Sequence, residues 1–174
     1  MILNLAVAEG AALKCELSSS PESISLAPPG DSDVEFGREV TAQLDVRRVA
    51  EEYFAVGTLS VQARFKCVRC LSAYEAPLST GLDMILHRVP EPQESGPELG
   101  SYVELPLGTA EFDLGPHVRE ALLLEFPQAP HCREDCRGLC PQCGVDLNKN
   151  NCSCAEAKID PRWEALRLPS TLEK

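Results

Sequence analysis

The chain has 174 residues and a formal net charge of −11, from 27 acidic and 16 basic side chains. This length fits one ordinary domain with a small appended module. This negative charge argues against binding of nucleic acid through a broad basic surface. It suits a basic protein partner better, although an acidic excess also serves solubility alone.

The first residues, MILNLAVAEGAALKC, carry no Lys or Arg before their apolar run, and Glu9 interrupts that run. We therefore expect neither a signal peptide nor a membrane span, and predict a soluble, cytoplasmic protein. A reducing compartment keeps cysteines as thiols. The nine cysteines, an odd number, then favour metal binding over a disulfide framework.

Alternating apolar residues predict strands in the middle of the chain. Apolar and polar side chains alternate over residues 34–46, 59–65 and 74–86, which is typical of half-buried strands. These strands are expected to form a twisted, mainly antiparallel sheet or partial barrel. Residues 18–33 and 89–102 are rich in Pro, Ser, Gly or acidic residues, and they predict loops.

A short strand is predicted at 109–114, before a helix that Asp113 is expected to cap and that has Pro116 near its start. The helix should stop before Pro127. The stripe expected to pack on the sheet comprises Val118, Leu122 and Phe126. The predicted fold class is α+β: mainly an antiparallel sheet or partial barrel, one or two packed helices and a cysteine-rich zinc-binding C-terminal segment.

Few apolar residues follow Pro127, and the main candidates for burial are Leu139, Val145 and Leu147. That segment cannot build its own core, but structural zinc contributes about 10–16 kcal/mol in peptide models and can replace one. A short helical pattern surrounds Trp163. We therefore predict three parts: a β-rich domain with a packed helix at 1–126, a zinc module docked on it at 127–155, and a tail at 156–174.

The strongest motif is the knuckle Cys140-Pro-Gln-Cys143-Gly144. Two cysteines three residues apart place both sulfurs on one ion, and Gly144 permits the tight turn. Cys152 and Cys154 follow after a short loop and can supply the other two ligands. Four thiolates make a closed, structural zinc site.

A second pair, Cys67 and Cys70, lies at the end of a predicted strand and leaves Cys132 and Cys136 as its partners. This grouping gives a second four-cysteine site, so one or two Zn²⁺ ions are expected per chain. Alternatively, Cys132 or Cys136 joins Cys140 and Cys143, with His131 as an optional nitrogen ligand.

No catalytic signature is present, and we predict that the protein is not an enzyme. HExxH, G-x-S-x-G, a glycine-rich phosphate loop and the deaminase H-x-E are all absent from the sequence, and its three histidines lack spaced partners. Arg69 between Cys67 and Cys70 resembles the setting of a redox dithiol, but the βαβ context of that motif is missing. Isolated Cys15 is expected to be an ordinary buried thiol.

Three stretches carry a resemblance to a known family: C-x-R-C-L at Cys67–Leu71, the helix end LLLEFPQAP, and CREDCRGLCPQCGVDLN followed by CSC. With them the chain resembles the YceD family of large ribosomal RNA subunit accumulation proteins, from about Val34 onward. The resemblance implies a bacterial cytoplasmic protein needed for normal levels of large-subunit ribosomal RNA, often encoded beside a small zinc-bearing protein of that subunit. It implies no catalytic activity and transfers no catalytic residues.

The leading hypothesis is a non-enzymatic zinc protein that acts in large-subunit assembly or ribosomal RNA stability through a basic ribosomal or assembly protein. It involves no membrane and no small-molecule substrate, and its contact with ribosomal RNA is indirect. One alternative is a thiol redox or zinc-responsive switch. Another is a direct RNA-binding zinc module, whose candidate contacts are Arg133, Arg137, Lys149, Arg47, Arg48, Arg64 and Arg69.

Overall fold

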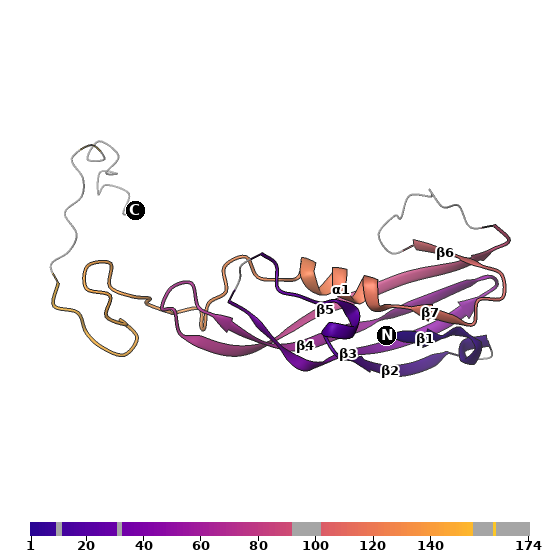
Figure 1. Cartoon of the computed structure of the whole chain (residues 1–174), viewed down its shortest axis with the longest axis horizontal. Coiled ribbons are helices and arrows are strands. Elements are labelled where there is room, and N and C mark those ends of the chain that lie inside the picture. Colours follow the sequence, from indigo (N-terminus) through magenta and orange to yellow (C-terminus); the bar gives the residue numbers. More distant parts are fainter. Residues whose placement is uncertain (10–11, 31–32, 92–101, 155–161, 163–174) are drawn as a thin grey trace, which may run out of the picture.

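The computed structural model describes residues 1–9, 12–30, 33–91, 102–154 and 162. It shows an elongated molecule in which a long β-sheet carries a helix on one face and the cysteine-rich segment at one end (Figure 1). Within these residues, no helix is both long and apolar enough to cross a membrane.

A five-stranded sheet with the order β2-β3-β4-β5-β6 forms the centre of the fold. Its strands are β2 (Leu13–Ser19), β3 (Glu35–Val49), β4 (Glu52–Lys66), β5 (Ala73–Val89) and β6 (Tyr102–Pro106). The first four strands pair antiparallel, whereas β6 runs parallel to β5. The long β4–β5 hairpin reaches the cysteine-rich end, so the residues that join its two strands lie beside that segment (Figure 1).

Alternation along β3 explains which face of the sheet becomes the core. Val40, Ala42 and Leu44 are buried, whereas Thr41 and Gln43 point to the other face. Full burial of an aliphatic side chain of this size contributes about 1.5–3 kcal/mol. A shift of one residue in register would expose the whole apolar set, so the pattern fixes the pairing of β3 with its neighbours.

A second layer covers the buried face of the sheet. It consists of α1 (Gly115–Leu124), the two-stranded sheet of β1 (Ile2–Asn4) and β7 (Glu111–Asp113), and the 3-10 turns η1 (Leu5–Glu9) and η2 (Glu22–Ile24). The helix packs on β4 and β5. The residues that this layer buries in the common core are Leu3, Leu5, Ile24, Leu26, Leu114, Val118 and Leu122.

Among the described residues, the structure confirms a mostly antiparallel β fold with one α-helix, and it corrects several details. The described strands form two open sheets and no closed barrel, and β6 adds a parallel pair that the sequence did not predict. Residues 18–33 are more than a loop, because they contain the end of β2, the η2 turn and two buried core residues. The helical pattern predicted around Trp163 lies outside the described residues.

The start of α1 also differs from the prediction. Leu114, with a helical backbone conformation, occupies the capping position, and the Asp113 carboxylate accepts the backbone N–H of Gly115 at 2.9 Å. Asp113 therefore still satisfies one free N–H at the helix start, one residue further out than expected.

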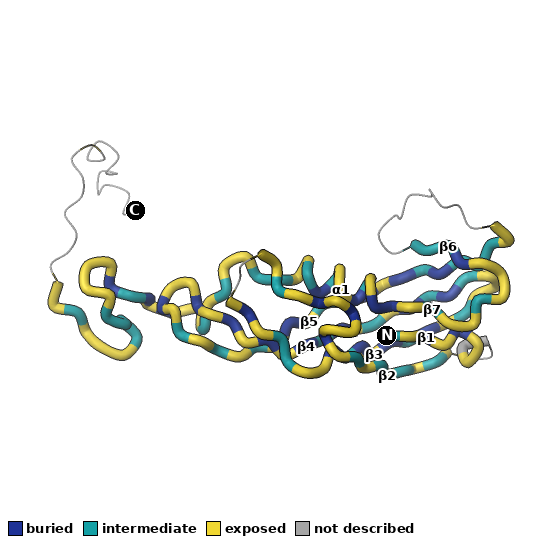
Figure 2. Tube along the Cα trace, viewed as in Figure 1, coloured by how far each residue is buried: buried dark blue, intermediate teal, exposed yellow. Residues whose placement is uncertain are grey.

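Few of residues 127–154 are buried, as Figure 2 shows. Their buried residues are Cys136, Gly138 and Cys140. The three apolar candidates for burial, Leu139, Val145 and Leu147, are only partly buried. Cysteine side chains therefore take the interior positions that aliphatic side chains occupy elsewhere in the protein.

Candidate metal centre

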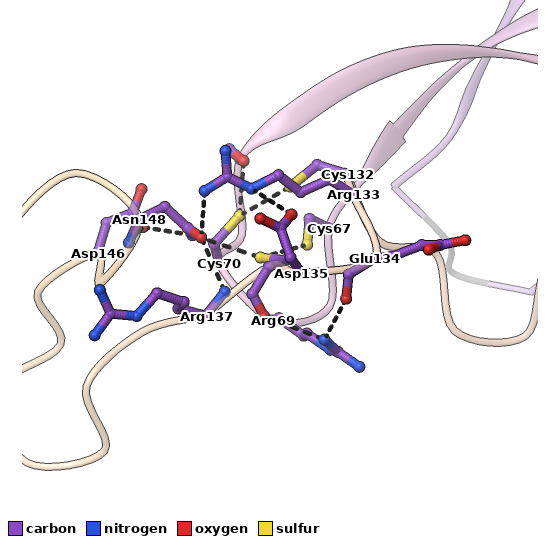
Figure 3. A network of polar contacts seen from close by, with 12 residues as sticks. Cys67, Arg69, Cys70, Cys132, Arg133, Glu134, Asp135, Arg137, Asp146 and Asn148 are labelled. Carbon is purple, nitrogen blue, oxygen red and sulfur yellow. Dashed lines mark hydrogen bonds and ion pairs between the residues drawn. The ribbon is translucent and has the colours of Figure 1, made fainter.

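The first knuckle joins β4 to β5 and carries Cys67 and Cys70. The Cys67 backbone N–H donates to the carbonyl of Ser72 at 2.9 Å, and the Leu71 N–H donates to the carbonyl of Cys67 at 2.8 Å. Leu71 adopts a left-handed backbone conformation with φ of 60°. This compact turn places both thiols on the side of the hairpin that faces the cysteine-rich segment (Figure 3).

The second knuckle repeats this arrangement within the cysteine-rich segment. Cys140 donates its N–H to the carbonyl of Val145 at 2.8 Å, and Gly144 donates its N–H to the carbonyl of Cys140 at 2.9 Å. Gly144 has φ of 72°, so it takes the position that Leu71 takes in the first knuckle. The Gln142 N–H also points at the sulfur of Cys140, at 3.4 Å. Amide groups aimed at sulfur favour the thiolate, which is the form that binds metal.

The first knuckle supplies half of one four-cysteine group, here called cluster one: Cys67, Cys70, Cys132 and Cys136. Its Sγ atoms lie within 4.8 Å of one another. Two measured separations, Cys67 to Cys136 and Cys70 to Cys132, are both 3.8 Å. With Zn–S bonds of about 2.3 Å, a regular tetrahedron separates its sulfurs by about 3.8 Å. The four thiols of cluster one therefore fit a tetrahedral metal ion.

Cluster two comprises Cys140, Cys143, Cys152 and Cys154, all from one short stretch of chain. The Cys143 and Cys152 sulfurs are 3.5 Å apart, and those of Cys140 and Cys152 are 3.3 Å apart. Cluster two is also the more open one, because Cys143 and Cys154 are exposed. Both clusters consist of free thiols.

Burial and hydrogen bonding give the thiols of cluster one different acidities. Burial disfavours ionisation of Cys67, but the backbone N–H groups of Cys70, Cys132 and Arg69 outweigh it and lower the Cys67 pKa to about 6. Burial, reinforced by the neighbouring thiols, raises the pKa of Cys132 to about 12. Without a cation, cluster one therefore holds thiolate and thiol side by side at neutral pH.

Cluster two shows the same contrast. The backbone N–H groups of Cys143 and Gln142 lower the pKa of Cys140 to about 6. Hydrogen bonding with the thiols of Cys152 and Cys143 raises the pKa of Cys154 to about 12. Four thiolates this close together need a positive ion between them, so the donor set of each cluster suits a thiophilic divalent metal.

Backbone contacts dock the cysteine-rich segment on the first knuckle. The Val68 N–H donates to the carbonyl of Pro130 at 2.9 Å, and the Leu139 N–H donates to the carbonyl of Arg69 at 3.1 Å. The Arg69 guanidinium donates to the carbonyls of Glu134 and Cys136, at 3.2 and 3.1 Å (Figure 3). From the sequence, Arg69 is a neighbour of a possible redox pair and a candidate RNA contact; in the structure, its guanidinium ties two segments of chain together.

The eight predicted ligands thus come together in two groups of four, and the grouping is the one that left Cys132 and Cys136 to the first knuckle. The alternative, with one of them in the second knuckle and His131 as a ligand, does not match the geometry. His131 faces the carbonyl of Ala129 at 3.2 Å and belongs to neither group. Cys15 is partly buried in β2, and burial raises its pKa. That these thiols bind metal stays a prediction.

The fold and the two clusters define a β-sheet protein with two four-cysteine groups that could each hold a metal ion, one shared between the β4–β5 turn and the cysteine-rich segment and one within that segment. A family model described as "Large ribosomal RNA subunit accumulation protein YceD" matches residues 55–168, a range that includes every cysteine of both clusters. The chain therefore belongs to the YceD family.

The curated relatives include proteins that carry this family's description. An uncharacterized protein of Mycobacterium tuberculosis is 32% identical over 136 residues, which cover 76% of this chain and 63% of the relative. The chloroplastic "Large ribosomal RNA subunit accumulation protein YCED homolog 1" of Zea mays is 24% identical over 148 residues, 69% of this chain and 50% of that protein. Its Arabidopsis thaliana counterpart is 31% identical over 64 residues, 37% of this chain and 20% of that protein. The chain spans about six tenths of the mycobacterial relative's length. No solved structure matches.

Proposed function

We propose that this chain is a non-enzymatic zinc protein that supports the accumulation of large-subunit ribosomal RNA by binding a basic protein of the ribosome or of its assembly machinery. The observation that carries the proposal is the convergence of two four-cysteine groups in a member of the YceD family. The proposal places the chain in a reducing, cytoplasmic compartment, where its thiols stay available to metal.

The closed ligand sets support a structural role for zinc. An ion held by four thiolates has no open position for a water molecule or a substrate, whereas catalytic zinc keeps one. Within the described residues, no further group of three or more His, Cys, Asp or Glu side chains converges in this way. The metal therefore holds residues 127–154 in shape and presents them next to the β4–β5 hairpin.

The charge distribution supports a basic protein partner. Six basic side chains lie within 3.7 Å of an acidic one: Arg47, Arg48, Arg64, Lys66, Arg133 and Lys149. They include five of the seven candidate RNA contacts, so much of the charge of those candidates is already offset within the chain. Acidic groups remain in excess, with a formal net charge of −11, and two all-thiolate sites add further negative charge. Such a surface steers and orients a cationic partner.

Affinity capture of the tagged, zinc-loaded chain tests the proposal. In moderate salt and after ribonuclease treatment, we expect recovery of a basic ribosomal or assembly protein, and loss of that protein when salt is raised. A matched capture with Arg137→Ala should recover the same partner, because Arg137 is not needed for a contact with cationic protein.

Direct RNA binding predicts a different outcome. Recovery of RNA without any accompanying protein would contradict the proposal. So would a filter-binding titration whose affinity falls steeply with salt and whose salt slope becomes shallower with Arg137→Ala, since each lost phosphate contact reduces that slope by about one.

A further inference from the structure

Asn148 belongs to the loop that cluster two closes, and its side chain points toward the thiols of cluster one (Figure 3). The loop runs between Cys143 and Cys152, whose sulfurs are 3.5 Å apart. Inside the loop, the Asp146 carboxylate accepts both the backbone N–H of Asn148 at 2.9 Å and its side-chain amide at 2.8 Å. The position of the Asn148 side chain therefore depends on the fold of the cluster-two loop.

The same side chain reaches a ligand of cluster one. Its amide nitrogen donates to the sulfur of Cys136 at 3.5 Å. Its carbonyl oxygen accepts the backbone N–H of Arg137 at 2.9 Å and a guanidinium N–H of Arg133 at 2.7 Å. Asn148 thus fixes the residues on either side of Cys136 and also contacts the sulfur itself.

Backbone pairing supports this contact. The Leu147 N–H donates to the carbonyl of Gly138 at 2.9 Å, and Leu139 forms a β-bridge with Asp146. The cluster-two loop is therefore held against the stretch that follows Cys136. When the loop loses its shape, both this pairing and the amide contact of Asn148 are lost together.

We infer that Asn148 couples the two clusters, so that a metal ion held in cluster two raises the affinity of cluster one for its own ion. The inference rests on the proposed zinc binding and adds a positioning residue to it. A hydrogen bond to a ligand sulfur stabilises the thiolate and orients it, and removing such an outer contact weakens metal binding by about 10–100-fold. Coupling of this kind is reciprocal, so cluster one also strengthens cluster two.

Site-resolved alkylation of the full, reduced, zinc-loaded chain tests the inference. Free zinc is lowered stepwise with a chelator, each sample receives a short pulse of N-ethylmaleimide, and peptide mass spectrometry measures the modified fraction of every cysteine. Cys132 and Cys136 report cluster one, whereas Cys140 and Cys152 report cluster two. With Asn148→Ala, we expect cluster one to need about 10–100-fold more free zinc for protection than in the unmodified chain.

Two further variants separate the contact from its surroundings. Asn150→Ala removes an exposed amide from the same loop and should leave both clusters within about 2-fold of their original affinities, well below a lost outer contact. Asn148→Asp keeps the oxygen that accepts from Arg137 but removes the amide that donates to both Cys136 and Asp146, and it should weaken cluster one at least as much as the alanine variant. Unchanged hydrogen exchange in β4 and β5 would show that each variant keeps its sheet.

Combining variants tests the coupling itself. The double change Cys143→Ser and Cys152→Ser removes cluster two and should weaken cluster one by a factor similar to that of Asn148→Ala. Adding Asn148→Ala to this chain should then cost nothing more, because the loop that positions Asn148 is already lost. If the combined variant loses zinc affinity at cluster one by the product of the two separate factors, the coupling is overturned. An Asn148→Ala chain whose clusters bind zinc like those of Asn150→Ala would also overturn it. Absence of zinc protection at every cysteine of the unmodified chain would instead remove the proposed zinc function itself.

Discussion

Gly138 and Gly144 share a left-handed backbone conformation, with φ of 73° and 72°, but differ in their surroundings. A Cβ atom on Gly138 would lie 3.0 Å from the backbone oxygen of Arg69, whereas one on Gly144 would have no atom within 4 Å. Only the first glycine therefore lets two segments of chain approach closely. Its position lies where the cysteine-rich segment meets the β4–β5 hairpin.

Replacement of these glycines by alanine should accordingly have unequal effects. Gly144→Ala costs about 1–2 kcal/mol from the left-handed conformation alone. Gly138→Ala adds a clash with a backbone oxygen, so it should also push the segment off the hairpin and weaken zinc binding at cluster one. Site-resolved alkylation measures both losses. If Gly138→Ala weakened zinc binding at cluster one no more than Gly144→Ala weakened it at cluster two, the result would contradict a close contact at Gly138.

Acidification should release zinc from both clusters. Without metal, Cys132 and Cys154 have pKa values of about 12, so an ion must already displace their protons at neutral pH. Below about pH 6, Cys67 and Cys140 also become protonated, and the number of displaced protons rises. Zinc affinity should therefore fall as pH falls, most steeply below about pH 6. A chromophoric zinc indicator measures the release between pH 8 and pH 5, and a release independent of pH would argue against thiolate ligation.

At the scale of elements, the close antiparallel pairing of β3 with β4 depends on Gly57. A Cβ atom there would lie 1.9 Å from the backbone oxygen of Gln43, which the strand pairing cannot accommodate without a shift. The neighbouring Gly81 in β5 offers a control, because a Cβ atom on it would meet only the Gly57 oxygen at 3.9 Å. Gly81 pairs across the sheet with Thr58, the residue that follows Gly57 in β4.

We expect Gly57→Ala to destabilise the protein by about 2 kcal/mol or more, which lowers Tm by roughly 5 °C. Gly81→Ala should change Tm by no more than about 2 °C, the shift expected for an ordinary surface substitution. Thermal unfolding followed by far-UV circular dichroism measures both. A Gly57→Ala protein as stable as the Gly81→Ala protein would show that β3 and β4 separate more freely than the structure indicates.

The elements differ in how far the sequence could predict them. Long alternating runs such as 34–46 predict strands well, because burial of one face dominates over such lengths. The three-residue β1 is too short for any period to show. The alternation of Leu13, Cys15 and Leu17 with polar residues is typical of a strand and could have predicted β2, which the sequence-based prediction omits. The parallel pairing of β6 is a tertiary choice that no local pattern encodes.

The candidate site was predictable where spacing alone decides the chemistry. Two cysteines three residues apart form a knuckle whatever surrounds them, so both knuckles could be identified before the fold was known. Which pairs meet depends on how the β4–β5 hairpin lies against residues 127–139, and spacing left that open. Asn148 gave no signal, since an asparagine in the stretch LNKNN is typical of any turn.

For the molecule as a whole, the sheet and the cysteine-rich segment draw their stability from different sources. The sheet has a continuous apolar core, whereas residues 127–154 bury mainly cysteines and a glycine. Loss of one zinc ligand should therefore loosen the segment without unfolding the sheet.

Cys140→Ser tests this division. We expect the variant to lose hydrogen-exchange protection over residues 127–154 and to keep it in β3, β4 and β5. Cys15→Ser is the matched control, because Cys15 lies outside both clusters and should alter neither region. Equal loss of protection throughout the Cys140→Ser chain would show that the segment and the sheet unfold as one unit.

The metal content of the protein decides the account most directly. Native mass spectrometry of freshly purified, reduced, full-length chain should find two zinc ions per molecule, and one after Cys143→Ser with Cys152→Ser. A metal-free molecule whose residues 127–154 are nonetheless fully protected from hydrogen exchange would contradict the account, because nothing else in that segment supplies a core.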